Sequence, residues 1–171
     1  DIIFLSENDS LSFLNVIDVS GDILPNFPIS FNGLAENGVS IADIDFDGRG
    51  DLIFSISNNI YAINHDGQIK DGFPFHGDTT FSTPITLIDI NSDDAIEIIV
   101  GDHSGYIYIL NGNGTLDTMF TFEEAISSGI SAGDIDQNGN FDIIFSSGSN
   151  LLHAWEPVLN EEVEGWPISI E

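Results

Sequence analysis

The sequence contains no cysteine, and only two of its 171 residues, Arg49 and Lys70, are basic. Without cysteine no disulfide can stabilise the fold, and the redox compartment is not indicated. A chain with so few basic residues and a strongly negative surface repels phosphates, so we expect neither nucleic acid nor anionic lipid head groups as partners. No apolar run reaches the length of a membrane-spanning helix, so we expect no membrane insertion.

The sequence is rich in negative charge, with 29 acidic residues and a formal net charge of −27. A hydrophobic content of 42% nevertheless indicates a folded chain rather than a disordered acidic tail. So negative a surface attracts divalent cations, which would neutralise part of its self-repulsion. Adaptation to high salt is an alternative explanation of the acidity, and the composition does not decide between the two.

The acidic residues recur in a nine-residue pattern. Three copies align without gaps and begin 46 and 45 residues apart: DIDFDGRGD (43–51), DINSDDAIE (89–97) and DIDQNGNFD (134–142). Each copy runs into a short apolar stretch that is typical of a buried β-strand. The opening DIIFL matches these stretches, so Asp1 takes the ninth position of a fourth copy.

Other landmarks keep the same spacing. A turn glycine recurs at Gly21, Gly67 and Gly114, and Asn160, which tolerates a positive φ nearly as well, takes the next equivalent place. Between these turns lie β-rich runs, and no window keeps a helical period over ten residues. A repeat of about 45 residues with some four short strands is typical of a β-propeller blade.

The sequence therefore predicts an all-β fold, a β-propeller forming a partial ring of about four blades. Each blade is a four-stranded antiparallel sheet, with strands A to D in chain order and the acidic loop between A and B. The expected repeats are 1–38, which lacks strand A, then 39–83, 84–128 and 129–171. We expect one propeller segment of a larger ring, which either needs the rest of its parent chain or self-associates.

The DxDxDGxxD loop before a strand such as DLIFSI, the run GYIYILN and the element GFP together resemble the FG-GAP/VCBS-type repeats of integrin α-subunit propellers and bacterial surface proteins. The resemblance covers essentially the whole chain. It implies six to eight blades in the complete ring, calcium in the A–B loops, and a bacterial or archaeal surface setting. The second loop departs from the pattern at Asp94 and Glu97, and the FG and GAP tripeptides themselves are not evident.

The loops have the chemistry of a calcium site. Calcium takes six to eight oxygen ligands, and side chains at positions 1, 3, 5 and 9 of a winding loop can surround it, with a backbone carbonyl at position 7. Turn formation alone also favours Asp and Asn, but it needs no such ligand spacing. We expect about three calcium ions per chain, with three sets of ligands: Asp43, Asp45, Asp47, Arg49 and Asp51; Asp89, Asn91, Asp93, Ala95 and Glu97; Asp134, Asp136, Asn138, Asn140 and Asp142.

The first loop also contains Arg49-Gly50-Asp51, a tripeptide known as an adhesion signal. Integrin binding would need a free Asp51 carboxylate, whereas position 9 of the loop directs that carboxylate inward. We therefore interpret the tripeptide as accidental.

The three loops differ in their expected affinity. The first has four carboxylates and a glycine at position 6, so it is expected to bind calcium most tightly. In the second loop position 6 is Asp94, which must adopt a left-handed conformation that costs a non-glycine residue about 1 kcal/mol.

The function predicted from these features is a calcium-binding extracellular or cell-surface module that acts as an interaction or adhesion scaffold for a protein or glycan ligand. The alternative is part of a carbohydrate-active enzyme, such as a polysaccharide lyase, with its catalytic residues outside this segment. No nucleophile–base pair is visible in the sequence, so an enzyme is the less favoured prediction. Trp155, in a predicted strand C, is kept as an alternative sugar-stacking residue.

Overall fold

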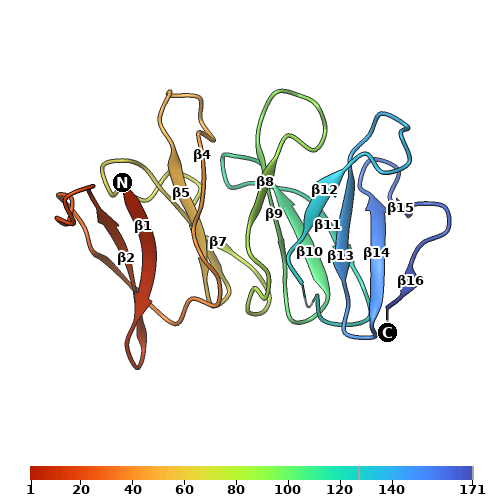
Figure 1. The fold of residues 1–171 in the computed structure, drawn as a ribbon, viewed down its shortest axis with the longest axis horizontal. Helices are drawn as coiled ribbons and strands as arrows, with labels where there is room; N and C mark the ends of the chain where they lie inside the picture. The colour runs from red at the N-terminus through yellow and green to blue at the C-terminus, as the bar shows by residue number, and fades with distance from the viewer. Residues whose placement is uncertain (127, 171) are drawn as a thin grey trace.

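The computed structural model describes residues 1–126 and 128–170, and within these residues every regular element is a β-strand. The strands form four antiparallel sheets that lie side by side in chain order, with the N-terminus and the C-terminus in the two outer sheets (Figure 1). No helix among the described residues is long and apolar enough to cross a membrane.

The first two sheets differ by one strand, as the repeat pattern predicts. The first contains β1 (Ile2–Glu7), β2 (Leu11–Ile17) and β3 (Ile29–Asn32) in the order β1-β2-β3. The second contains β4 (Ser40–Ala42), β5 (Asp51–Ile56), β6 (Asn59–Ile63) and β7 (Phe75–His76). The first sheet thus consists of strands B, C and D, whereas the second also has strand A.

The third sheet has the same four-strand meander, and the fourth has an additional strand. The third contains β8 (Thr86–Ile88), β9 (Glu97–Gly101), β10 (Tyr106–Leu110) and β11 (Leu116–Thr121). The fourth contains β12 (Ser131–Gly133), β13 (Asp142–Ser146), β14 (Leu151–Glu156), β15 (Glu161–Glu162) and β16 (Ile168–Ser169). Both β15 and β16 pair with β14, because a turn at Gly165 with φ +90° divides the expected strand D into two pieces.

The burial of the strands follows from their neighbours. Every residue of β5 and β9 is buried, since these strands lie in sheets covered on both faces. In β2, which lies in the outermost sheet, buried residues alternate with partly exposed ones. The wholly apolar runs and the alternating runs of the sequence thus correspond to inner and outer positions in the row of sheets.

The hydrophobic core lies between successive sheets, in three clusters. Between the first two sheets Phe31 contacts Phe54 and Tyr61, with ring centroids 5.1 and 4.7 Å apart. Between the last two sheets Trp155 packs against Phe122, with centroids 5.3 Å apart in an edge-on arrangement. Trp155 therefore contributes to packing between sheets rather than forming an open platform for a sugar.

The turns predicted from the repeat spacing have the expected backbone conformation. The φ angle is +88° at Gly21, +78° at Gly67, +80° at Gly114 and +57° at Asn160. The prediction that Asn160 replaces a glycine at a left-handed position is confirmed.

Candidate metal centre

The three complete acidic loops connect strand A to strand B in the second, third and fourth sheets. They leave the row of sheets at the same edge, the upper one in Figure 1. Each loop turns sharply because two of its residues have positive φ. At position 6 the residues are Gly48 (+85°), Asp94 (+69°) and Gly139 (+96°); at position 4 they are Phe46 (+60°), Ser92 (+61°) and Gln137 (+63°). The left-handed conformation predicted at Asp94 is confirmed, whereas that at position 4 was not predicted from the sequence.

The carboxylate at position 1 organises each loop. Asp43 accepts hydrogen bonds from the backbone N–H groups of Asp47 and Gly48, at 3.0 and 2.9 Å. Asp89 does the same for Asp93 and Asp94, at 3.0 and 2.9 Å. In the third loop Asp134 accepts from Asn138 and Gly139, at 3.0 and 3.1 Å. The same side chain that is a candidate ligand therefore also holds the loop in its turn.

At positions 3 and 5, a side-chain oxygen accepts the backbone N–H of the residue two positions further along the loop. At position 3, Asp45, Asn91 and Asp136 accept from the N–H of position 5, at 3.4, 3.0 and 3.1 Å. At position 5, Asp47, Asp93 and Asn138 accept from the N–H of position 7 at 2.8 Å in every loop; the position 7 donors are Arg49, Ala95 and Asn140.

The residue at position 9 is the first residue of strand B and is buried in every loop. Asp51 is 2% exposed, and Glu97 and Asp142 are completely buried. One carboxylate oxygen of each accepts the backbone N–H of position 2, from Ile44 at 3.2 Å, Ile90 at 2.9 Å and Ile135 at 2.9 Å. This bond ties the start of strand B to the start of the loop.

The second oxygens of Glu97 and Asp142, Oε1 and Oδ1, are buried and have no hydrogen-bond partner. Glu162 Oε2, outside the loops, is a further buried carboxylate oxygen of this kind. Burial raises the pKa of the Glu97 and Asp142 carboxyl groups, and the neighbouring loop carboxylates raise it further. Buried carboxylate oxygens are normally paired, so these two unpaired oxygens at equivalent loop positions are candidate ligand atoms.

The side-chain oxygens of two loops converge. One oxygen from each of Asp43, Asp45 and Asp51 lies within 4.8 Å of the others, and the same holds for Asp134, Asp136 and Asp142. In the second loop, where position 3 is Asn91, no three acidic side chains come this close in the described part of the chain. An all-oxygen donor set of this kind suits calcium or magnesium better than zinc or copper.

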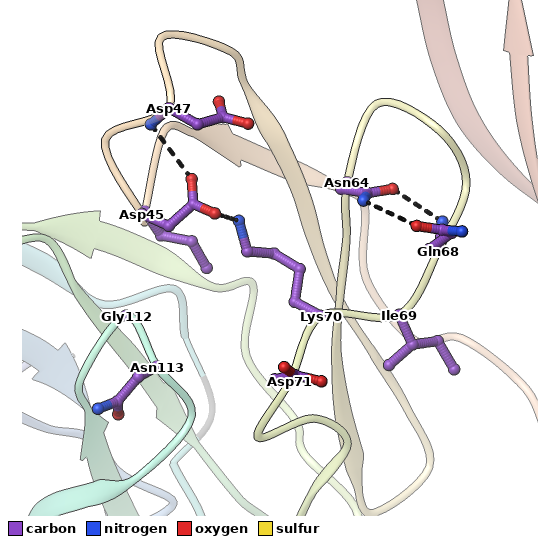
Figure 2. Close-up of a pocket in the computed structure, with 10 residues that line it drawn as sticks. Asp45, Asp47, Asn64, Gln68, Ile69, Lys70, Asp71, Gly112 and Asn113 are labelled. Atoms are coloured by element: carbon purple, nitrogen blue, oxygen red, sulfur yellow. Dashed lines mark hydrogen bonds and ion pairs between the residues drawn. The ribbon is translucent and has the colours of Figure 1, made fainter.

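The first loop contains a contact that the other two lack. Lys70 Nζ lies 2.6 Å from Asp45 Oδ2 and 2.7 Å from Asp51 Oδ2. Although burial alone would lower the pKa of Lys70, its hydrogen bonds to these two carboxylates raise it, and the bond from Lys70 lowers the pKa of Asp45. Figure 2 shows the lysine side chain extended toward Asp45, at the wall of a pocket of about 500 Å³ that also reaches Gly112 and Asn113 of the third sheet.

The Arg49-Gly50-Asp51 tripeptide is not available as an adhesion signal in this conformation. The Asp51 carboxylate is buried, and it is occupied by Lys70 and by the backbone of Ile44. A receptor could reach it only after the start of β5 had opened.

A second polar cluster, which the sequence analysis did not find, lies on β14. His153 Nδ1 is 2.5 Å from Glu162 Oε1, and His153 Nε2 is 3.2 Å from Ser147 Oγ. The order serine, histidine, carboxylate is that of a nucleophile with its base. However, Ser147 is only 6% exposed and its hydroxyl also bonds Ser149, while the Phe145 ring stacks on the imidazole at 4.8 Å. Such burial favours a structural role in the turn between β13 and β14.

Comparison with known proteins agrees with this architecture. Residues 89–145 match a family model described as FG-GAP-like repeat. This span begins at Asp89 of the second loop and ends within β13, so it includes two of the three acidic loops. No curated protein matches the chain.

Solved structures share the fold over nearly the whole chain. BBS1N in complex with ARL6DN has a TM-score of 0.65 at 14% identity and covers 99% of this chain and 56% of its own. BamB from Moraxella catarrhalis has a TM-score of 0.60 at 14% identity, with 98% and 45% covered. The WD40 domain of Pan2 from Neurospora crassa has a TM-score of 0.57 at 11% identity, with 96% and 48% covered.

The chain thus spans about half the length of the solved propellers that it matches. At these identities the likeness concerns the fold alone. Taken together, the four sheets, the FG-GAP-like repeat at residues 89–145 and the structural neighbours identify the chain as a repeat β-propeller.

Proposed function

We propose that the chain is a calcium-binding module of an extracellular β-propeller, with about three ions per chain, one in each complete acidic loop. The observation that carries this proposal is the pair of buried oxygens without partners, Glu97 Oε1 and Asp142 Oδ1. A calcium ion in each loop would give these oxygens a partner and would offset the repulsion among the loop carboxylates.

The ligand sets follow the loop positions. In the third loop the ion would be held by Asp134, Asp136, Asn138 and Asp142, with the carbonyl of Asn140; the other two loops would use the equivalent residues. The bound ion supplies structural charge and not chemistry, because it fastens the start of strand B to the loop. The proposal includes an extracellular setting. Calcium sites of extracellular modules have Kd values of about 10⁻⁴–10⁻³ M, and sites of this affinity fill only where calcium is present at such concentrations.

The module would act as a scaffold that binds a protein partner. Support comes from BBS1N, a propeller of similar fold that was crystallised in complex with ARL6DN. The net charge of −27 favours a partner with a basic surface, because complementary charge accelerates association.

Calorimetric titration of the metal-free chain with calcium tests the proposal, with magnesium as the competing cation. We expect calcium uptake at or below millimolar concentration, together with a higher melting temperature. Two substitutions, Glu97→Gln and Asp142→Asn, should each remove one binding event. Absence of calcium uptake at millimolar concentration would overturn the proposal.

A further inference from the structure

Lys70 has an unusual position for one of only two basic residues in a chain of net charge −27. Its side chain is 11% exposed, and its ammonium group lies between two candidate ligands of the first loop, Asp45 and Asp51. Long cationic side chains normally extend into water. Here the desolvation free energy of the buried ammonium group is offset by two short ion pairs.

The fold of the blade does not require a lysine at this place. Lys70 lies three residues after the turn glycine Gly67, and the equivalent residues of the other repeats are Leu24, Asp117 and Val163. The backbone N–H of this position bonds strand C in the same way in three repeats: Leu24 to Val16, Lys70 to Ala62, and Val163 to Ala154, at 2.9, 2.9 and 2.8 Å. The backbone thus has the same geometry at this position in three repeats, whereas only the second repeat has a basic side chain there.

The position 9 carboxylates differ accordingly. Glu97 and Asp142, whose repeats have Asp117 and Val163 in place of the lysine, each keep a buried oxygen without a partner. In the second repeat Lys70 supplies Asp51 with a positive partner at 2.7 Å, at Oδ2, the oxygen that also accepts the N–H of Ile44. Among the described residues, Asp51 is thus the one position 9 carboxylate that forms an ion pair.

We propose that the Lys70 ammonium is a built-in substitute for the metal in the first loop, so that this loop binds calcium most weakly of the three. This inference rests on the proposed calcium function and concerns the selectivity among its sites. Calcium would need the oxygens of Asp45 and Asp51 at about 2.3–2.6 Å, and these are the oxygens that Lys70 already holds. Two cations cannot share them without strong repulsion, so calcium enters only when the lysine side chain moves out.

This order is the reverse of the one predicted from carboxylate count. The first loop has the most carboxylates, but part of their charge is already neutralised from within the chain. In the metal-free protein the first loop is therefore the one already stabilised, while the second and third depend on added metal.

The test compares Lys70→Met with Arg49→Met by calcium calorimetry on the full chain. Each variant loses one positive charge, but the Arg49 side chain is exposed and holds neither Asp45 nor Asp51. We expect two tighter sites and one weaker site in the wild type. In Lys70→Met the weak site should tighten by about tenfold or more, because calcium then binds without first displacing an ammonium group from Asp45 and Asp51. Arg49→Met should change it much less. Adding Asp43→Asn to Lys70→Met should abolish the tightened site and so assign it to the first loop.

Melting of the metal-free variants gives an independent measurement. Lys70→Met should melt at a lower temperature than Arg49→Met, because it leaves Asp45 and Asp51 facing each other without a cation. If wild type and Lys70→Met bind three ions with equal affinities, the inference is wrong while the calcium proposal stands. If no variant binds calcium, the proposed function fails. If metal-free Lys70→Met and Arg49→Met have equal melting temperatures, the role of Lys70 as a substitute cation is wrong as well.

Discussion

Replacing Asp142 with asparagine should change stability in opposite directions with and without calcium. Asp142 is completely buried at the first position of β13, and its Oδ2 accepts the N–H of Ile135 at 2.9 Å. Its Oδ1 has no partner. Asparagine keeps the shape and the bond to Ile135 but removes the buried negative charge.

The magnitude in the metal-free protein follows from the cost of an unpaired buried group, which is about 1–3 kcal/mol and more for a charged one. Because the asparagine side chain would place a buried NH₂ group where Oδ1 has no partner, part of this gain is lost, and we expect a net gain of about 1–2 kcal/mol. For a chain of this length that corresponds to a rise in melting temperature of roughly 2–8 °C.

With calcium the order should reverse. An ion at a concentration one hundred times its Kd adds about 2.7 kcal/mol to the stability of the native state. The variant loses most of this contribution at the third loop, so it should be less stable than the wild type by about 1 kcal/mol. Thermal melting in the presence of a chelator and in excess calcium measures both differences.

The pH dependence has a definite sign. Burial raises the pKa of Asp142 in the folded state, so the destabilisation is absent at pH values below the ordinary carboxyl pKa and grows as the pH rises through the raised value. The metal-free wild type and Asp142→Asn should therefore converge in stability on acidification and separate toward neutral pH.

Asp51→Asn is the matched control, because Asp51 has the same loop position but is paired with Lys70 at 2.7 Å. In the metal-free protein it should lower stability, since it removes one of the two partners of a largely buried ammonium group. If Asp142→Asn lowered metal-free stability as much as Asp51→Asn does, the assignment of an unpaired carboxylate would be refuted.

Two further predictions concern the backbone. Asp94 has φ +69°, so Asp94→Gly should stabilise the second loop by about 1 kcal/mol and tighten its calcium site. The control Asp94→Ala removes the same carboxylate but keeps a Cβ in the left-handed conformation, so it should not tighten the site. Equal calcium affinities of the two variants in calorimetry would contradict this prediction. Gly72→Ala should lower the melting temperature more than Gly21→Ala. Both glycines have φ near +90°, but an added Cβ at Gly72 would lie 2.0 Å from the carbonyl oxygen of Asn113, while nothing lies within 4 Å of one at Gly21. Similar losses would show that the turns of the second and third sheets are not in firm contact.

Much of the architecture could be predicted from the repeat. A constant spacing between acidic loop, apolar strand and turn glycine predicts one supersecondary unit repeated along the chain, because each unit can bury its faces only against its neighbours. The left-handed residues Asp94 and Asn160 were predictable for the same reason, since alignment with glycine shows where a positive φ is needed. The separate strand β15 was not predicted. The first and second repeats turn at the same place, at Asn26 (φ +71°) and Gly72 (φ +89°), but where β15 pairs with β14 they have only the single bridges Ile17–Ile23 and Ile63–Ile69.

Local spacing predicted three sets of ligands. The structure brings the carboxylates of positions 1, 3 and 9 together in the first and third loops, because the turn of the loop itself does so, whereas the described residues of the second loop form no such group. What lies behind the loop was decided only by the tertiary structure. Lys70 reaches Asp51 from 19 residues away, across the sheet, and His153 meets Ser147 and Glu162 only through the pairing of β13, β14 and β15. Likewise, Glu97 and Asp142 look like ordinary loop carboxylates in the sequence, yet both are fully buried in the folded structure. Burial and long-range pairing depend on how whole strands are arranged. The sequence therefore determined where the candidate sites lie, and the pairing of strands decided which of them already contains a positive charge.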